Sequence, residues 1–371
     1  MRTNPNSVLE IKLDRIRDNY LHIKSKLEPQ TKCSVVVKAN AYGLGMNKVA
    51  QALVDAKCQE FCVAYLDEGL ELRKVAPDAS IRLFNGFQKE ELTELVHGGF
   101  VPVLNDFYQI KLLNEKAKKI GKKLKGIIQL DTGMGRLGLD RFQMKRLIEN
   151  PDLFSHIKVE YIMSHLACAD DALHPLSLKQ LNLFNKRAQN FPNTKMTLAN
   201  SAGVMLGQKY HFDMVRPGCA IYGINPIPSW ANEFKQVVEL KGRVVQVRHV
   251  KKDMNISYHC QHTARKGDVI ATVLCGYADG YMRYLTNNSF AYYKGIRLPI
   301  VGTVTMDMIM VDVTQVPEND LAEMKFLELI GDNITVDEVA ARARTIGYEV
   351  FTRLGNRFER IYSDESSSNN W

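Results

Sequence analysis

Residues 33–45 read CSVVVKANAYGLG, a run of valines that ends in a lysine, Lys38, and continues into a glycine-bounded turn. The valines predict a buried strand, because short runs of β-branched residues favour extended structure. A lysine at the end of such a strand can be a snorkelling side chain or a member of a buried ion pair. It can also be a nucleophile, since a desolvated amine loses basicity and forms Schiff bases. This stretch alone leaves both interpretations open.

Seven similar β-rich runs follow, and each ends in polar or glycine-containing residues. They occupy 60–69, 80–86, 100–106, 125–133, 158–167, 195–201 and 212–218. Helix-like segments, such as 47–56 and 89–99, lie between most of them. Alternating strand and helix patterns predict parallel βαβ units, and eight such units match a (β/α)8 TIM-type barrel. A doubly wound parallel sheet is the alternative.

After about residue 234 the pattern changes to alternating strands, at 237–250, 267–277, 296–304 and 307–314. Only 335–347 predicts a helix there, with Thr335 as its N-cap and Gly347 past its end. We therefore expect three parts: a barrel domain at 1–234, a mainly β domain at 235–363, and a polar, disordered tail at 364–371.

Composition argues against several classes of protein. The net charge is +8, but the densest basic run, 111–126, has apolar residues at helical spacing, so its lysines are expected on a solvated helix face. We therefore expect no nucleic-acid partner. The seven cysteines are scattered, so we expect them to be reduced thiols that form no metal site. No apolar run approaches the roughly 18 residues of a membrane span, and no signal peptide is visible, so we expect a cytoplasmic protein.

In a barrel of this type the active site lies at the carboxyl ends of the strands. Lys38 follows the first predicted strand, and the later strand ends carry Asp131, Arg136, His165, Asn200, Ser201 and Arg216. The small-residue loops 199–203 and 216–223 suit a phosphate, although each alone could be a tight turn. A lysine nucleophile beside a phosphate grip suggests pyridoxal phosphate.

The chain resembles the alanine racemase family over nearly its whole length. VVVKANAYGLG is similar to the family's cofactor-lysine motif, and DTGMGRLG, SHLA, ANSAG, RPG, SYHCQHTARKGD, GYADGY and TMDMIMVD follow in the family's order. The resemblance implies a barrel domain, a β domain, a head-to-tail homodimer and bound pyridoxal phosphate. It also implies interconversion of L- and D-alanine, which supplies D-alanine for peptidoglycan.

By resemblance, Lys38 holds the cofactor as an internal aldimine and acts as a base on one face of the substrate α-carbon. Tyr258, supplied by the partner subunit, is the opposing acid/base. An ordinary tyrosine has a pKa of about 10, so a phenolate at pH 7 needs about 4 kcal/mol of stabilisation. A nearby cation is therefore expected; Arg136 is the family's candidate and also binds the substrate carboxylate.

Arg216 is expected to face the pyridine nitrogen, oriented by His165. Arginine stays protonated, so it donates a hydrogen bond without protonating the ring, and this restrains side reactions. Related barrel decarboxylases place an acidic residue there, so RPG favours racemisation. The resemblance assigns further cofactor contacts to Tyr42, Asn200, Ser201, Gly218, Cys219 and Tyr348. It assigns the substrate pocket and its access passage to Tyr277, Met306 and Asp307, although Tyr277 could simply pack within the β domain.

Two other functions remain open at this point. A broad-specificity amino-acid racemase would share the fold, although such relatives are often exported. A non-enzymatic pyridoxal phosphate carrier resembles residues 1–234 in outline, but it would leave the β domain and Tyr258 without a purpose.

The chain departs from the family's pattern at two places. It has RFER at 357–360, where the family usually has a proline, and Gln129 where many members carry a carbamylated lysine. Glutamine forms no carbamate and offers Arg136 only a neutral oxygen. We expect Arg136 to be less neutralised, or to have a bound anion such as chloride beside it.

A less neutralised Arg136 should favour the phenolate form of Tyr258. Replacing Gln129→Lys restores the carbamate-forming side chain, so the acid limb of the pH–rate profile should move to higher pH. The profiles of the wild type and the variant should be measured side by side. Profiles that overlay would contradict the hypothesis.

Overall fold

The computed structural model describes residues 6–364. The chain forms two compact units. The first, called the barrel unit, comprises Arg17–Ala41 and Gly45–Phe234, and the second, called the β unit, comprises Met1–Ile16, Tyr42–Leu44 and Lys235–Trp371. Of the expected disordered tail, 364–371, all but Asp364 lies outside the described residues.

The strands of the barrel unit form one parallel sheet that closes on itself. Its described strands run in the order β2-β10-β9-β8-β7-β6-β5-β4-β3. β2 (Lys32–Cys33) pairs with β10, and β3 (Val35–Val36) pairs with β4. Because only Ser34 separates β2 from β3, they are two halves of one strand and the ring is closed. The (β/α)8 prediction is confirmed, and the doubly wound alternative is excluded.

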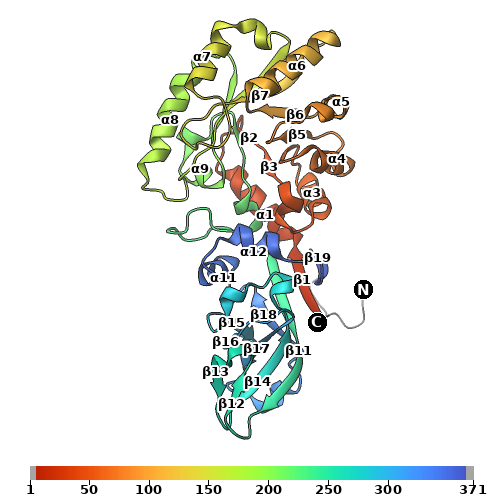
Figure 1. The fold of residues 1–371 in the computed structure, drawn as a ribbon, viewed down its shortest axis with the longest axis vertical. Helices are drawn as coiled ribbons and strands as arrows, with labels where there is room; N and C mark the ends of the chain where they lie inside the picture. Colours follow the sequence, from red (N-terminus) through yellow and green to blue (C-terminus); the bar gives the residue numbers. More distant parts are fainter. Residues whose placement is uncertain (1–5, 365–371) are drawn as a thin grey trace. The chain divides into compact units, whose positions relative to one another are not determined.

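The other barrel strands are β4 (Glu60–Val63), β5 (Ser80–Leu83), β6 (Val101–Leu104), β7 (Leu124–Gln129), β8 (Ile157–Met163), β9 (Lys195–Thr197) and β10 (Met214–Val215). Helices lie outside these strands (Figure 1). They are α3 (Met46–Asp55), α4 (Leu66–Val75), α5 (Leu92–His97), α6 (Phe107–Lys119), α7 (Arg141–Glu149), α8 (Pro175–Ala188) and α9 (Ser201–Met205). An earlier helix, α1 (Leu13–Ser25), connects β1 to β2.

Helix α6 contains most of the lysine-rich segment. It buries Ile110, Leu113 and Ala117, while Lys111, Lys118 and Lys119 are exposed, so the prediction of a solvated basic face is confirmed. Within the barrel, buried side chains from neighbouring strands fill the interior; they include Val101, Val103, Ile127, Tyr161, Met163 and Met214.

The β unit is built on a mostly antiparallel sheet. Its order is β14-β17-β16-β15-β18-β11-β1-β19, and an additional β14–β11 pairing closes six of these strands into a ring. The strands are β11 (Val238–His249), β14 (Val269–Leu274), β15 (Phe290–Tyr293), β16 (Ile296–Val301), β17 (Met308–Asp312) and β18 (Phe326–Ile330). A separate hairpin consists of β12 (Met254–Ile256) and β13 (His262–Ala264). The predicted mainly β domain is confirmed.

The N-terminal segment corrects the expected first domain, 1–234. Strand β1 (Ser7–Lys12) pairs with β11 and, in parallel, with β19 (Glu359–Ser363), so this segment belongs to the β unit. The reason is its alternating pattern, which buries Leu9 and Ile11 in that sheet.

The predicted helix of the β unit is confirmed as α11 (Val336–Arg342), and Thr335 caps it by accepting a hydrogen bond from the Glu338 amide at 3.2 Å. We expected Gly347 to lie just past the end of this helix. It instead begins another helix, α12 (Gly347–Arg353). Arg344, between the two helices, has a φ of +55°, which breaks the helical conformation. The β unit also contains a short helix, α10 (Glu318–Leu321), that the sequence pattern did not predict.

The seven cysteines are free thiols. Within 6–364, every helix is too short or too polar to cross a bilayer.

The cap of α11 yields a stability prediction. Replacing Thr335→Val keeps the side-chain shape but removes the cap, so the free energy of unfolding should fall by about 1 kcal/mol. Chemical denaturation of the wild type and the variant measures this difference. A Thr335→Ser variant, which keeps the hydroxyl, should restore most of the loss, and equal stability of all three would contradict the assignment.

Candidate active site

Lys38 begins a left-handed turn at the end of β3. The next four residues, Ala39, Asn40, Ala41 and Tyr42, have φ values of +53°, +55°, +53° and +57°. Left-handed backbone costs roughly 1–2 kcal/mol per non-glycine residue, so surrounding contacts must hold this turn. Glu68 accepts a hydrogen bond from the Ala39 amide at 2.6 Å, and Asn40 Oδ1 accepts one from the Met46 amide at 2.8 Å.

The environment of Lys38 favours a neutral amine. Its side chain is half-buried, and burial lowers its pKa, with the nearby Arg136 guanidinium lowering the pKa further. The carboxylate of Glu68 opposes this shift. The predicted nucleophile therefore lies where a lysine loses basicity.

Arg216 lies buried inside the barrel with nearly all of its donors engaged. Its Nη1 donates to Thr197 Oγ1, and its Nη2 donates to the carbonyls of Ser164 at 2.7 Å and Leu198 at 3.2 Å. Its Nε is buried and has no partner among the described residues. Burial lowers the pKa of Arg216 to about 10, so the guanidinium remains charged at neutral pH and its Nε–H is left to donate.

His165 contacts Arg216, as the sequence predicts. Arg216 Nη2 lies 3.4 Å from His165 Nδ1. Burial and, to a smaller extent, the charges of Arg216, Arg136 and Lys38 together lower the pKa of His165 to about 3. A neutral imidazole can accept the hydrogen bond at Nδ1, so the low pKa and the contact agree.

The two small-residue loops predicted from the sequence lie side by side. Asn200 caps α9 by accepting a hydrogen bond from the Gly203 amide at 2.9 Å. The neighbouring Ser201 Oγ accepts hydrogen bonds from the Gly218 amide at 2.9 Å and the Ala220 amide at 3.3 Å. Pairing of β9 with β10 brings these loops together, and Cys219 is buried in the second of them.

Arg136 is exposed at the end of the loop that follows β7. Asp131 shapes this loop, because its Oδ1 accepts hydrogen bonds from the amides of Gly133, Met134 and Gly135 at 2.9, 3.0 and 3.1 Å. Among the described residues no hydrogen bond joins Gln129 to Arg136. The buried Gln129 amide instead donates to the Leu137 carbonyl at 3.2 Å, because the loop folds back against β7.

The β unit groups the remaining predicted residues. The rings of Tyr42 and Tyr348 have centroids 5.8 Å apart. The Tyr277 and Ala278 amides donate to the carbonyls of Thr305 and Met306 at 3.1 and 3.0 Å, which joins the two predicted substrate loops. Tyr277 is 44% exposed and Met306 53%, so neither is a core packing residue.

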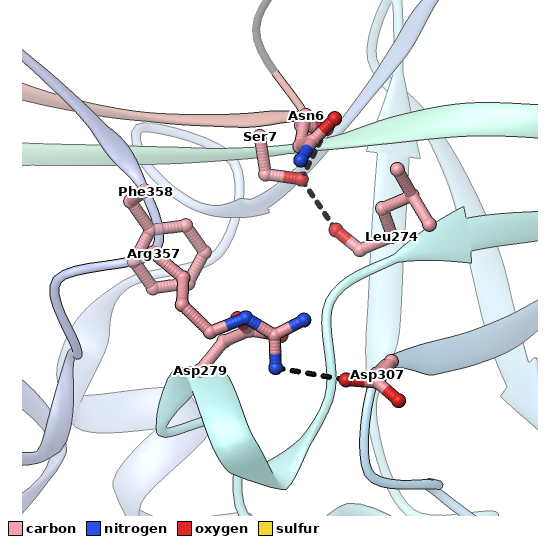
Figure 2. A pocket seen from close by; sticks show the side chains of 7 residues that line it. All are labelled: Asn6, Ser7, Leu274, Asp279, Asp307, Arg357 and Phe358. Atoms are coloured by element: carbon pink, nitrogen blue, oxygen red, sulfur yellow. Dashed lines mark hydrogen bonds and ion pairs between the residues drawn. The ribbon is translucent and has the colours of Figure 1, made fainter.

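Asp307 is held by Arg357, a residue that sequence reasoning did not select. Figure 2 shows the Arg357 guanidinium pointing toward Asp307, with Nη1 2.8 Å from Asp307 Oδ1. Arg357 Nε also lies 3.1 Å from Asp279 Oδ1. Arg357, the first residue of RFER, thus ties the Tyr277 loop to the Met306 loop. Only the spacing of acidic residues near both loops could have indicated such a clamp.

Tyr258 lies in the loop between β12 and β13, and its side chain is 69% exposed. Among the described residues its phenol makes no hydrogen bond. The structure therefore groups Lys38, Arg136, His165, Arg216, Ser201 and Gly218 in the barrel unit, and Tyr258, Tyr277, Met306 and Asp307 in the β unit.

Comparison with known proteins identifies the family. Residues 11–226 match the alanine racemase N-terminal domain, and residues 237–362 match the alanine racemase C-terminal domain. The chain belongs to the alanine racemase family.

Relatives within this family are similar along nearly the whole chain. The chain is 40% identical to the alanine racemase of Rhodospirillum rubrum over 96% of each protein, and 40% identical to the catabolic alanine racemase of Agrobacterium fabrum over 95% of this chain and 91% of the relative. A crystal structure of the Bartonella henselae alanine racemase, with covalently bound pyridoxal phosphate, has a TM-score of 0.91 and 38% identity over 96% of this chain and 99% of that one. The biosynthetic alanine racemase of Pseudomonas aeruginosa has a TM-score of 0.88 and 32% identity over 97% and 99% of the two chains.

The pKa of His165 gives a prediction about acid stability. In the unfolded chain this imidazole takes up a proton near pH 6.5, but in the folded protein it stays neutral down to about pH 3. The unfolded state therefore binds more protons between these values, so stability falls as the pH falls through this window.

A His165→Gln variant removes this titration but keeps an oxygen that can accept from Arg216. Its stability should fall less steeply below pH 6.5, by up to about 1.4 kcal/mol per pH unit, the value for one proton. Denaturation at pH 7, 6 and 5 measures the slope. Parallel slopes for the wild type and the variant would contradict the assignment of a neutral His165.

Proposed function

We propose that this protein interconverts L- and D-alanine with pyridoxal phosphate bound at Lys38. The observation that carries this proposal is the buried Arg216, whose single unpartnered Nε donor lies in the same polar cluster as the low-pKa Lys38 amine. A pyridine nitrogen is a hydrogen-bond acceptor and would satisfy this donor. The site therefore fits the cofactor that the family's chemistry requires.

Other residues fit the phosphate of the cofactor. Ser201 and the small-residue backbone from Gly218 are joined by hydrogen bonds from the Gly218 and Ala220 amides to Ser201 Oγ, and we assign the phosphate to this pair of loops. Asn200 holds this loop through its cap of α9. We assign phosphate contacts also to Cys219, Tyr42 and Tyr348.

When bound, pyridoxal phosphate withdraws electrons from the α-carbon of an amino acid whose nitrogen it holds. The protein must then move protons on and off that carbon. Lys38 Nζ, with its lowered pKa, accepts and returns a proton on one face. Tyr258 does the same on the opposite face, and two acid/bases on opposite faces invert the centre.

Arg216 controls which reaction follows. Its pKa of about 10 keeps it protonated at neutral pH, so it would donate a hydrogen bond to the ring nitrogen without transferring its proton. An acidic residue at this place would keep the ring nitrogen protonated and so favour side reactions. Neutral His165 orients Arg216 without adding a second charge.

The substrate is recognised by its carboxylate and by its size. Arg136 is exposed on its loop and close enough to lower the pKa of Lys38, so it can bind a carboxylate beside the reacting carbon. Tyr277, Met306 and Asp307 restrict the passage to small side chains such as methyl. Tyr258 comes from the second subunit of a homodimer, and the product D-alanine serves peptidoglycan synthesis in the cytoplasm.

The activity is tested by incubating purified holoenzyme with L-alanine and following D-alanine. L-serine, L-lysine and L-arginine are assayed in parallel. Alanine should be turned over preferentially; faster turnover of a long basic amino acid would indicate a broad-specificity racemase. No turnover of any of them would contradict the proposal and favour a carrier of the cofactor.

Attachment at Lys38 is a separate prediction. Borohydride reduction of the holoenzyme should place the reduced pyridoxyl adduct on the peptide that contains Lys38. A Lys38→Ala variant should lose the adduct and lower kcat by about 1000-fold or more, because both the attachment point and a base are removed. The matched control is Lys48→Ala, at an exposed position of α3, which should keep both. An adduct on another peptide would contradict the assignment of Lys38 as the attachment point.

A further inference from the structure

The loop that carries Tyr258 has a strained backbone. It connects β12 to β13, which pair from Met254 with Ala264 to Ile256 with His262. Ser257 has φ +63° and ψ −175°, a region that is occupied almost only by glycine. His259 and Cys260 also have positive φ values, +63° and +51°. Such a conformation persists only where neighbouring contacts determine it.

Thr303 makes the contacts that hold the start of this loop. It follows β16 and is 3% exposed. Its Oγ1 donates to the Tyr258 carbonyl at 2.9 Å, and its own carbonyl accepts a hydrogen bond from Ser257 Oγ at 2.8 Å. The two hydrogen bonds therefore fix the two backbone positions that determine where the Tyr258 side chain begins.

The residues around Thr303 support the same arrangement. Gly302 has a φ of +74°, and a Cβ added there would lie 3.0 Å from the Ile256 carbonyl oxygen and from Ser257 Cβ. Asn287 accepts a hydrogen bond from the Gly302 amide at 2.6 Å and donates to the Gln261 carbonyl at 3.4 Å. Gly302 thus packs closely against the start of the loop 257–261, and Asn287 links Gly302 to the end of that loop.

The Tyr258 phenol itself is exposed and makes no hydrogen bond among the described residues, so its direction depends on the conformation of the backbone that carries it. We propose that Thr303 is a positioning residue that aims Tyr258 by holding the strained loop 257–261. The inference rests on the proposed function, in which Tyr258 handles the proton on one face of the α-carbon. Loss of the Thr303 hydroxyl should therefore impair that face and leave the Lys38 face intact.

The test substitutes Thr303→Val, which keeps the shape of the side chain and removes the hydroxyl, and Thr303→Ser, which keeps the hydroxyl. Each alanine enantiomer is incubated separately in D2O, and deuterium at the α-carbon of the recovered substrate is measured. Lys38 can remove and return a proton on its own face, so exchange of one enantiomer needs no Tyr258. Exchange of the other enantiomer, and racemisation, need Tyr258.

In Thr303→Val, racemisation and exchange of the Tyr258-dependent enantiomer should fall about 10-fold, because small misplacements of a catalytic group cost large factors in rate. Exchange of the other enantiomer and the KM for alanine should change less than about twofold. Thr303→Ser should restore the wild-type ratio of the two exchange rates. Tyr258→Phe should show the same asymmetry in a stronger form.

Thr335→Val is the matched control, because it removes a hydroxyl hydrogen bond elsewhere in the β unit. It should lower stability without changing the exchange ratio. If Thr303→Val lowered both exchange rates equally, or left both unchanged, the inference would be overturned while the proposed function stood. A wild type that does not racemise alanine would overturn the function instead. If Tyr258→Phe lowered the exchange rates of both enantiomers equally, the proposed role of Tyr258 would be wrong, and the inference with it.

Discussion

The burial of Arg216 is the constraint on which the polar centre of the barrel unit depends. A guanidinium removed from water is costly unless its donors are satisfied. Here the acceptors are a threonine hydroxyl, two backbone carbonyls and an imidazole nitrogen, from Thr197, Ser164, Leu198 and His165. They come from the ends of β8 and β9, so the register of these strands with β10 determines whether the charge can be accommodated. No carboxylate among the described residues pairs with it, and this leaves a donor rather than a neutralised cation.

The same neutral surroundings explain the state of the neighbouring groups. Burial is the largest cause of the lowered pKa values of His165 and Lys38, and positive charge adds to it, from Arg216 and Arg136 at His165 and from Arg136 at Lys38. His165 is thereby kept as an acceptor, which is the state that Arg216 requires. Lys38 is moved toward the free amine, which is the state that imine formation and proton transfer require. In the proposed function, this one arrangement serves attachment of the cofactor, orientation of Arg216 and acid–base chemistry at Lys38.

Strained backbone occurs beside both proposed acid/bases. The left-handed turn 39–42 follows Lys38, and the loop 257–261 contains Tyr258. In each case side chains from elsewhere in the same unit supply the restraining hydrogen bonds, Glu68 for the first and Thr303 for the second. Such restraint reduces the freedom of the reactive group before substrate binds, and this lowers the entropic cost of reaching the transition state.

The sequence by itself determined the alternation of strands and helices, the change to a β domain and the residues at the strand ends. Those features depend on local periodicity and on the rule that parallel strands share one carboxyl rim. The contact of His165 with Arg216 was expected only from the resemblance to the family. Only the tertiary structure decided that β1 joins the β unit, that Gln129 bonds to Leu137, and that Arg357 and Thr303 hold the loops. These outcomes depend on partners far apart in the sequence and on desolvation, which no local pattern encodes.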